Sequence, residues 1–540
     1  MKRPQPGWRL TVPGLAAAAL LGIGVTLNPA IAILVVGGTI LAIFALRDLS
    51  LLIAATLLFN MLGEPYRLAY QSISLGGLNL YANDILLAVL ACALLLKGLR
   101  TAGDSGRVAG GLRAASGSGA VSDGLHATSG SGAVSDGLRF AARTARDPIS
   151  IVLLAFIAYG FFSLARSYPL FGSAAVTTFR VRFLYALLFF LSIPVLRDPR
   201  SRRRLLIAIL FGAAWISLFG LYNAATGSFV GGRTSSHTYR YLSSLQALAV
   251  FFGLSLLIGT VWARRRSLAT LMLGGLYLAG ILISQARSIW AGAIAGMLVA
   301  VFGSHDWRRN LVRLALPVGI VLLVFVLIGS LTGRVDLTQG IVTRAASFTA
   351  APEDLTTIWR LYVWGEALRQ LQVNPLIGLG LGHPFVYFDV LQDSWDDSRQ
   401  LHNSYLELAF SSGAIATLLF ALFQALVFLR TLSAARRGRH SGLSPTLLAL
   451  AASQVCLGAA AFANVVGDSM VSTIYVWILS AVSVVVAREA IAGGTQVARV
   501  GIAAGCRQAG PRAGCRQAGP GAGCKQAGPE QPAPAPPDAE

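Results

Sequence analysis

Apolar runs long enough to cross a lipid bilayer recur along almost the whole chain. A transmembrane α-helix needs about 20 consecutive, mainly apolar residues, and about fourteen segments approach that length here. Only 12% of the 540 residues are charged, roughly half the share in an average soluble domain. The sequence therefore predicts an all-α, polytopic membrane helix bundle of about 12–14 transmembrane helices. The candidate helices are 10–28, 30–46, 49–62, 82–99, 149–165, 183–196, 205–222, 241–262, 267–284, 289–303, 314–331, 403–429, 446–464 and 471–487.

The formal net charge of +21 would also suit a nucleic-acid-binding protein. Its distribution argues against that class, because the arginines cluster in short loops between apolar runs, where the positive-inside rule predicts them. The clusters at 197–204, 264–266, 308–313 and 430–439 all fall on one side of a single topology. We therefore expect these loops in the cytoplasm, membrane lipids around the bundle, and no nucleic-acid partner.

Two repeat regions differ in composition from the apolar segments. Residues 101–139 repeat a unit rich in Gly, Ser and Ala, and a second repeat, over 504–530, leads into a Pro-Ala end. Such segments bury little, so we expect a flexible linker and a disordered tail, both cytoplasmic. The expected organisation is N-terminal transmembrane helices (1–99), linker (100–148), transmembrane helices (149–331), large periplasmic loop (332–402), C-terminal transmembrane helices (403–490) and tail (491–540).

The loop at 332–402 is long for a tight helix bundle, and such loops are usually functional. Its segment "TIWRLYVWGEALRQL" (357–371) is expected to form a helix lying in the membrane interface. Ile358, Leu361, Leu368 and Leu371 would share one face of it, and its tryptophans would suit the headgroup layer. "GLGLG" (378–382) lacks the spacing of a nucleotide-binding loop and is read as a turn.

Three ionisable residues on the outer side are candidates for chemistry. Arg287, between two closely spaced helices, and Arg360, on the interfacial helix, either reach towards lipid headgroups or hold an anionic substrate. His402, at the start of an apolar run, either caps that helix, is simply solvated, or accepts a proton near neutral pH. Nothing in their immediate sequence decides between these readings.

Several neighbours could bind substrate. Asn403 and Glu407 lie one helical turn apart, and a glutamate inside an apolar helix favours a polar cavity. Arg180 and Arg182 in "FRVRF", with Arg233 and Arg240, could form a second ring of positive charge, although reaching towards headgroups also explains them.

Taken in order, these residues resemble the O-antigen ligase and polymerase superfamily of bacterial membrane glycosyltransferases. The resemblance rests on "QARS" with Arg287, on Arg360 with Trp364 four residues later, on "NPLIGLGLG" (374–382), and on "HNSYLELAFSSGAI" (402–415). In the ligase pattern His-Asn is followed by nine residues and a glycine, as it is here at Gly413. The last position of the ligase pattern, a small or hydroxyl residue three positions after this glycine, falls on Ala416 here, with Thr417 next. This departure slightly favours the polymerase relatives over the ligases.

The resemblance implies transfer of a glycan from an undecaprenyl diphosphate donor on the periplasmic face of the inner membrane, with neither cofactor nor metal. His402, Arg287 and Arg360 would be catalytic, and Asn403, Trp364, Glu407, Arg233, Arg240 and Arg180 would contact substrate. The arginines would stabilise charge on the leaving diphosphate, and His402 would orient or deprotonate the acceptor hydroxyl.

The acceptor remains open at this stage. It is lipid A-core for a ligase, a second lipid-linked glycan for an O-antigen or exopolysaccharide polymerase, and a protein for an O-oligosaccharyltransferase; the His-Asn-x9-Gly spacing favours the ligase. A transporter or flippase of lipid-linked glycans is the alternative from another class. It is disfavoured because the spans show no internal repeat and their polar residues gather at one face.

Overall fold

The computed structural model describes residues 48–63, 72–75, 78–81, 83–85, 87–94, 146–226, 242–262, 267–304, 355–389, 393–397, 400–438, 442–464 and 470–508, together with 319, 342, 345, 346 and 466. The helices expected at 10–28 and 30–46, the 101–139 repeat, and Arg233 and Arg240 lie outside these residues. So does the helix expected at 314–331, apart from residue 319, and the 504–530 repeat is described only as far as Gln508.

Apolar helices dominate the described part of the chain, which confirms the all-α membrane bundle predicted from the sequence. Within the described ranges, six segments are long and apolar enough to cross a membrane. They comprise α6 (Pro148–Phe171), α7 (Ser173–Arg182) continued by η3 (Leu184–Ala186) and α8 (Leu187–Leu196), α9 (Pro199–Thr226), α16 (Ser404–Arg437), α17 (Ser444–Phe462), and the Ser472–Gly493 part of α18 (Met470–Gln508).

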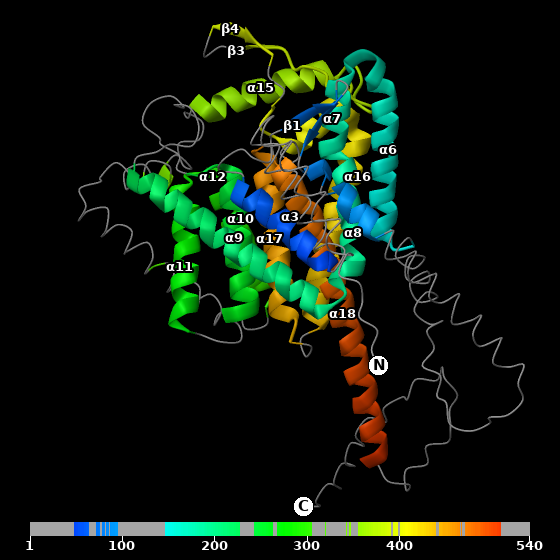
Figure 1. Cartoon of the computed structure of the whole chain (residues 1–540), viewed down its shortest axis with the longest axis vertical. Helices are drawn as coiled ribbons and strands as arrows, with labels where there is room; N and C mark the ends of the chain where they lie inside the picture. Colours follow the sequence, from blue (N-terminus) through cyan, green and yellow to red (C-terminus); the bar gives the residue numbers. More distant parts are fainter. Residues whose placement is uncertain are drawn as a thin grey trace, which may run out of the picture.

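Shorter apolar helices complete the bundle (Figure 1). They are α3 (Leu49–Gly63), α10 (Ser244–Leu256) with its π-helical continuation η4 (Leu257–Trp262), α11 (Leu268–Ile283) and α12 (Arg287–Phe302). The most extensive helix pair is α12 with α17. A Cβ on Gly296 of α12 would come within 2.5 Å of the Ala452 carbonyl oxygen of α17, and one on Gly292 within 2.9 Å of the Cys456 carbonyl. Small residues four apart allow this close approach, as is common between membrane helices.

One helix does not run with the bundle. α15 (Leu355–Leu371) lies across the end at which α6 finishes and α16 begins (Figure 1); we call this the α15 end. Two short antiparallel hairpins are also described: β1 (Ser72–Leu75) pairs with β2 (Leu78–Tyr81), and β3 (Tyr387–Asp389) pairs with β4 (Ser394–Asp396). The crosswise position of α15 agrees with the interfacial helix expected at 357–371.

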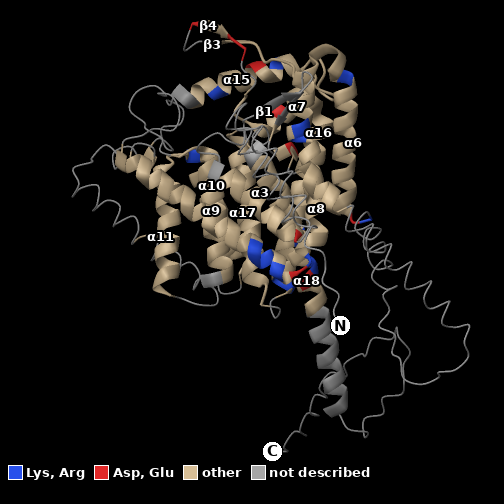
Figure 2. Ribbon diagram, viewed as in Figure 1, with Lys and Arg blue, Asp and Glu red and all other residues tan. Residues whose placement is uncertain are grey.

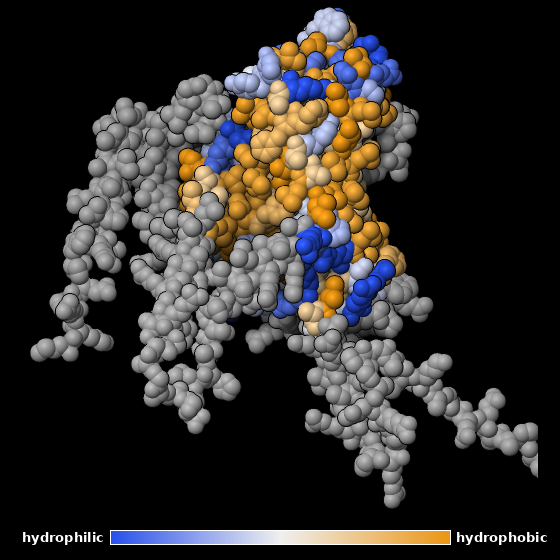
Figure 3. Space-filling model, turned by 90° about the vertical axis from the view of Figure 1, so that its right-hand side faces the viewer, coloured by the Kyte–Doolittle hydropathy of each residue, from blue (hydrophilic) through white to orange (hydrophobic). Residues whose placement is uncertain are grey.

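Arginines gather at the opposite end of the bundle, which we call the basic end (Figure 2). There Asp147, just before α6, accepts hydrogen bonds from Arg430 of α16 and Arg488 of α18. Burial alone would raise the pKa of the Asp147 carboxyl, but these two guanidinium groups outweigh it and hold the pKa below its ordinary value. A hydrophobic surface lies between the two ends (Figure 3), as expected for helices surrounded by lipid. The described residues of the predicted cytoplasmic clusters at 197–204 and 430–439 thus share one end.

Several boundaries differ from the sequence-based ones. The short span expected at 183–196 begins ten residues earlier, at Ser173, because α7 carries its two arginines inside the helix. α18 continues to Gln508, beyond the expected end at 487. On α15, Ile358, Leu361 and Leu368 are exposed as expected, but Leu371 is buried against the bundle.

Candidate functional site

His402 occupies an unusual backbone conformation at the start of α16. Its φ is +51°, in the left-handed region that residues with a Cβ rarely adopt. The next residue, Asn403, is the helix N-cap: its side-chain oxygen accepts hydrogen bonds from the backbone N–H groups of Tyr405 and Leu406, each at 3.1 Å. Asn403 is buried, so the structure gives this candidate substrate-binding residue a capping contact with α16.

α15, the helix that carries Arg360, contacts His402 through Trp359. The indole of Trp359 meets the imidazole of His402 edge to face, with ring centroids 5.7 Å apart. Trp364, one turn further along, donates from Nε1 to the carbonyl oxygen of Leu401 at 2.8 Å. Arg360 itself is partly buried. Both tryptophans therefore contact the bundle rather than lying only against headgroups as the sequence suggested.

Arg287 reaches the same end as the first residue of α12. Asn464, just after α17, connects the two helix starts: its Nδ2 donates to Ser288 Oγ, and its carbonyl accepts from Ser404 Oγ at 2.8 Å. Ser288, next to Arg287, and Ser404, two residues after His402, thus share Asn464 as a hydrogen-bond partner. The structure brings His402, the helix start bearing Arg287 and the helix bearing Arg360 together at the α15 end.

Glu407 is buried, with 2% of its surface exposed, and its Oε1 accepts the backbone N–H of Leu401 at 2.7 Å. Its carbonyl oxygen accepts a hydrogen bond from Arg182 Nη1 at 2.9 Å, and the same nitrogen donates to Ser411 Oγ. The polar surroundings expected around a glutamate in an apolar helix are therefore present, and protein groups supply them.

The two arginines of "FRVRF" have different environments. Arg180 is 7% exposed, forms an ion pair with Asp84 at 2.9 Å and lies over the ring of Tyr81. Tyr185 donates to the same carboxylate. Arg182 instead contacts α16 beside Glu407. Sequence reasoning placed Arg180 among the substrate-binding residues and gave Arg182 no separate role; their spacing alone could not show which of them Asp84 pairs with.

A polar cavity of about 210 Å³ lies next to the residue that precedes His402. His383, absent from the sequence-based candidates, lines it and hydrogen-bonds through Nδ1 to the Pro384 carbonyl at 2.7 Å. Leu401 and Glu407 form part of its wall. The other lining residues that can contact a polar ligand are Thr177, Thr178, Arg182, Gln400 and Ser411.

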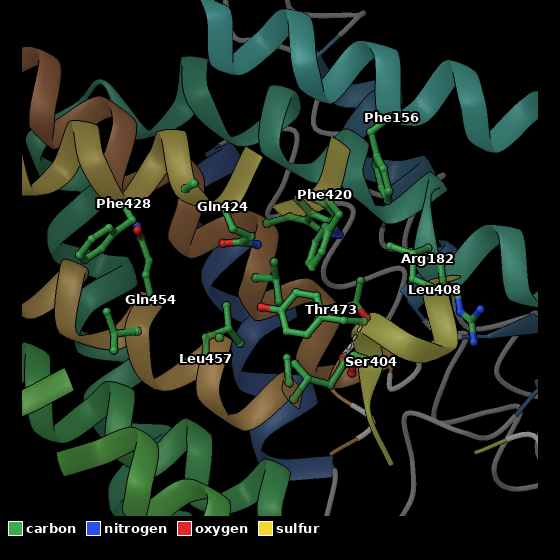
Figure 4. Close-up of a pocket in the computed structure, with 18 residues that line it drawn as sticks. Phe156, Arg182, Ser404, Leu408, Phe420, Gln424, Phe428, Gln454, Leu457 and Thr473 are labelled. Atoms are coloured by element: carbon green, nitrogen blue, oxygen red, sulfur yellow. Dashed lines mark hydrogen bonds between the residues drawn. The ribbon is translucent and has the colours of Figure 1, made fainter. Parts of the chain in front are cut away.

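An apolar pocket of about 190 Å³ lies between α6, α16, α17 and α18 (Figure 4). Arg182 and Ser404 are at one end of it, and Phe428 and Gln454 at the other. Arg182 lines both this pocket and the polar cavity. Arg182 therefore lies between a polar space beside the His402 loop and an apolar space between membrane helices.

The "GLGLG" turn explains the glycine of the His-Asn-x9-Gly pattern. α16 is kinked at Gly413, whose φ is +77°, and the turn docks on the kink through backbone hydrogen bonds. A Cβ on Gly413 would lie 2.1 Å from the carbonyl oxygen of Leu376, so no side chain fits. The nine residues between Asn403 and Gly413 thus separate the start of α16 from the kink on which the 376–380 loop packs.

Comparison with known proteins gives two matches that cover this region. A protein-family model described as O-antigen ligase matches residues 272–421. Among curated proteins, the chain is similar to an O-antigen ligase from Pseudomonas aeruginosa, with 26% identity over 292 residues. That match covers 52% of this chain and 64% of the relative, so it spans less than two thirds of the relative's length. Both matches support the similarity of this chain to the O-antigen ligase superfamily.

Proposed function

We propose that this protein is a membrane glycosyltransferase that transfers a glycan from undecaprenyl diphosphate to an acceptor hydroxyl. The ligase reaction, with lipid A-core as acceptor, is the form we favour, because both matches carry the O-antigen ligase description. The bundle would lie in the bacterial inner membrane with its α15 end facing the periplasm, since the basic end has the charge expected of a cytoplasmic face.

The observation that carries the proposal is the meeting of His402 with the two arginine-bearing helix segments at one end of the bundle. A leaving diphosphate needs cationic donors, and a guanidinium offers a planar pair of donors that stay charged at any physiological pH. Arg287 and Arg360 would stabilise the charge that develops on the diphosphate. His402 would accept the proton of the acceptor hydroxyl as that oxygen attacks the anomeric carbon.

In this mechanism the two arginines take the electrostatic role that a metal ion fills in other phosphate chemistry, so we propose a metal-independent reaction. One displacement, with no protein nucleophile, would invert the anomeric configuration. The bond formed is between acceptor oxygen and anomeric carbon, the bond broken is between anomeric carbon and diphosphate oxygen, and undecaprenyl diphosphate leaves.

The cavities support an amphipathic substrate. An apolar pocket between membrane helices suits part of a polyprenyl chain, and the polar cavity beside Leu401 suits a hydroxyl-rich group. Arg182 lines both, so a phosphate that joins the two parts would lie close to this residue. The exposed apolar residues of α15, Ile358, Leu361 and Leu368, would border the lipid through which the donor arrives.

The test is glycan transfer by purified protein in liposomes, with a labelled undecaprenyl-diphosphate-linked glycan and lipid A-core as acceptor. Replacing Arg287, Arg360 or His402 with Ala should in each case lower the transfer rate by about 100-fold or more while expression is kept. Arg369→Ala is the matched control, because Arg369 lies on the same helix as Arg360 but is exposed and paired with Glu366. Absence of transfer by the wild type, or equal loss in the control, would contradict the proposal.

Orientation needs a separate experiment. In a cysteine-free background, Asp393→Cys would lie near the α15 end and Arg203→Cys at the basic end. A membrane-impermeant maleimide added to intact spheroplasts should label the first and leave the second unlabelled. The reverse pattern would place His402 on the cytoplasmic side and exclude the proposed reaction.

A further inference from the structure

The residue before His402 is held by side chains from two different helices. The backbone N–H of Leu401 donates to Glu407 Oε1 at 2.7 Å, and its carbonyl oxygen accepts from Trp364 Nε1 at 2.8 Å. Glu407 belongs to the first turn of α16, whereas Trp364 belongs to α15, which crosses the end of the bundle. Leu401 itself is 1% exposed; its bond to Glu407 is buried, and its bond from Trp364 is partly buried.

These bonds matter because of the conformation that follows. His402 has φ +51°, and a residue with a Cβ persists in this region only when its surroundings fix it there. Rotation about the backbone on either side of Leu401 would move the imidazole relative to the ring of Trp359, which it now contacts. Fixing both polar groups of Leu401 removes that freedom.

Each of these two side chains uses one polar atom to hold the Leu401 backbone, and Glu407 also lines the polar cavity. The Oε1 atom of Glu407 and the Nε1 atom of Trp364 both bond to the protein backbone. The indole of Trp364 packs edge to face on Phe462 of α17, with centroids 5.5 Å apart. A carboxylate acceptor makes a stronger hydrogen bond than a neutral group does, and the bond between Leu401 and Glu407 is buried, where a hydrogen bond is stronger than in water.

We propose that Trp364 and Glu407 are positioning residues that clamp Leu401 and thereby hold the His402 imidazole in its reactive place. This inference rests on the proposed function and replaces the direct substrate contacts that the sequence suggested for these two residues. Because Trp364 is on α15, the clamp also ties the lipid-bordering helix to the catalytic loop. Displacement of α15 would then change the position of His402.

Four variants test the clamp in the liposome transfer assay. Trp364→Phe removes the donor but keeps a ring, and Glu407→Met removes the acceptor with little change in volume. Each should lower kcat about tenfold, equivalent to about 1.4 kcal/mol, with the donor KM unchanged. Glu407→Gln keeps an oxygen acceptor and should restore most of the rate. The double variant Trp364→Phe/Glu407→Met should fall no further than the worse single variant, because both act through one residue.

A readout without turnover separates the clamp from the proposed reaction. The rate at which diethylpyrocarbonate modifies His402, followed by mass spectrometry, should rise several-fold in Trp364→Phe and Glu407→Met. Trp395→Phe is the matched control, since Trp395 is 73% exposed and should leave this rate unchanged. Thermal unfolding of each variant in detergent shows that the fold is retained.

The outcomes are distinct. If wild-type protein transfers no glycan but the modification rates change as stated, the proposed function fails and the clamp stands. If the wild type is active and both single variants keep its kcat and its modification rate, the clamp is overturned. A rise in donor KM with unchanged kcat would also overturn it, because that pattern indicates direct substrate binding.

Discussion

Replacing Gly413 with Ala should destabilise the protein and remove its activity, although the substitution adds only a methyl group. Gly413 has φ +77°, and an added Cβ would lie 2.1 Å from the carbonyl oxygen of Leu376, 2.3 Å from its carbon and 2.5 Å from the nitrogen of Ile377. All three are backbone atoms, so no side-chain rotation relieves the clash. The loop or the kink must move.

The loss in free energy of unfolding comes from backbone strain at position 413 and from the hydrogen bonds that this movement breaks. A residue with a Cβ in this backbone region costs about 1–3 kcal/mol, and each backbone hydrogen bond lost between the loop and α16 adds about 0.5–1.5 kcal/mol. With one such bond lost, we expect Gly413→Ala to lower the free energy of unfolding by roughly 2–4 kcal/mol. The bonds at risk are Leu379 N to Phe410 O (2.8 Å), Gly380 N to Ser411 O (3.0 Å) and Ala414 N to Pro375 O (2.9 Å).

The assay is thermal unfolding of purified protein in detergent, followed by glycan transfer below the unfolding temperature. Gly365→Ala is the matched control: Gly365 is in α15, and no atom lies within 4 Å of an added Cβ. The control should be neutral or gain about 0.5–1 kcal/mol from helix propensity. An unfolding midpoint and transfer rate for Gly413→Ala equal to those of the wild type would refute the docking of the 376–380 loop on the kink.

Three further predictions follow from other contacts. Gly296→Leu should separate α12 from α17 and lower both stability and transfer, because its Cβ already falls 2.5 Å from a backbone oxygen; wild-type unfolding would contradict that packing. Because pairing lowers the pKa of Asp147 in the folded protein, the ionised carboxylate stabilises the fold at pH values above its ordinary pKa of 3.8, and this stabilisation is lost as the pH falls through the lower folded value. Asp147→Asn should therefore reduce the free energy of unfolding by about 1–3 kcal/mol at pH 7 and make stability less dependent on pH in acid. An unchanged dependence of stability on pH would refute the pairing. Gly458→Leu should fill the apolar pocket, since a Cβ there meets only the Tyr405 hydroxyl, at 3.6 Å; donor KM should rise several-fold at constant stability, and an unchanged KM would exclude the pocket as a chain site.

Periodic and compositional signals in the sequence predicted much of the fold. Long apolar runs placed the starts of α6 and α16 and both ends of α17 to within two residues, whereas α6 and α16 end later, and α9 starts earlier, than the apolar runs indicated. The start of α16 was also readable, because Asn403 is a favourable N-cap residue. The start of a span at Ser173 could not be predicted from the sequence, because two arginines make this segment too polar to be recognised as part of a span. The ion pair that one of them forms with Asp84 is visible only in the structure.

The site was predicted less completely, because its contacts join residues far apart in the chain. The sequence singled out His402, Arg287 and Arg360 as candidates, and the structure brings their segments to one end. It did not separate Arg180, whose ion pair depends on Asp84 almost a hundred residues earlier, from Arg182. The bond between Trp364 and Leu401 likewise depends on how α15 lies across the bundle, which no local pattern encodes.

The most direct test of the central claim compares the His402→Ala variant with the wild type in two measurements: single-turnover glycan transfer in liposomes and binding of the labelled lipid-linked donor. Loss of a positioned general base should slow transfer by about 10²–10⁴-fold, while donor binding stays within a factor of two or so, because the arginines carry the diphosphate contact. Transfer at the wild-type rate would contradict the role given to His402.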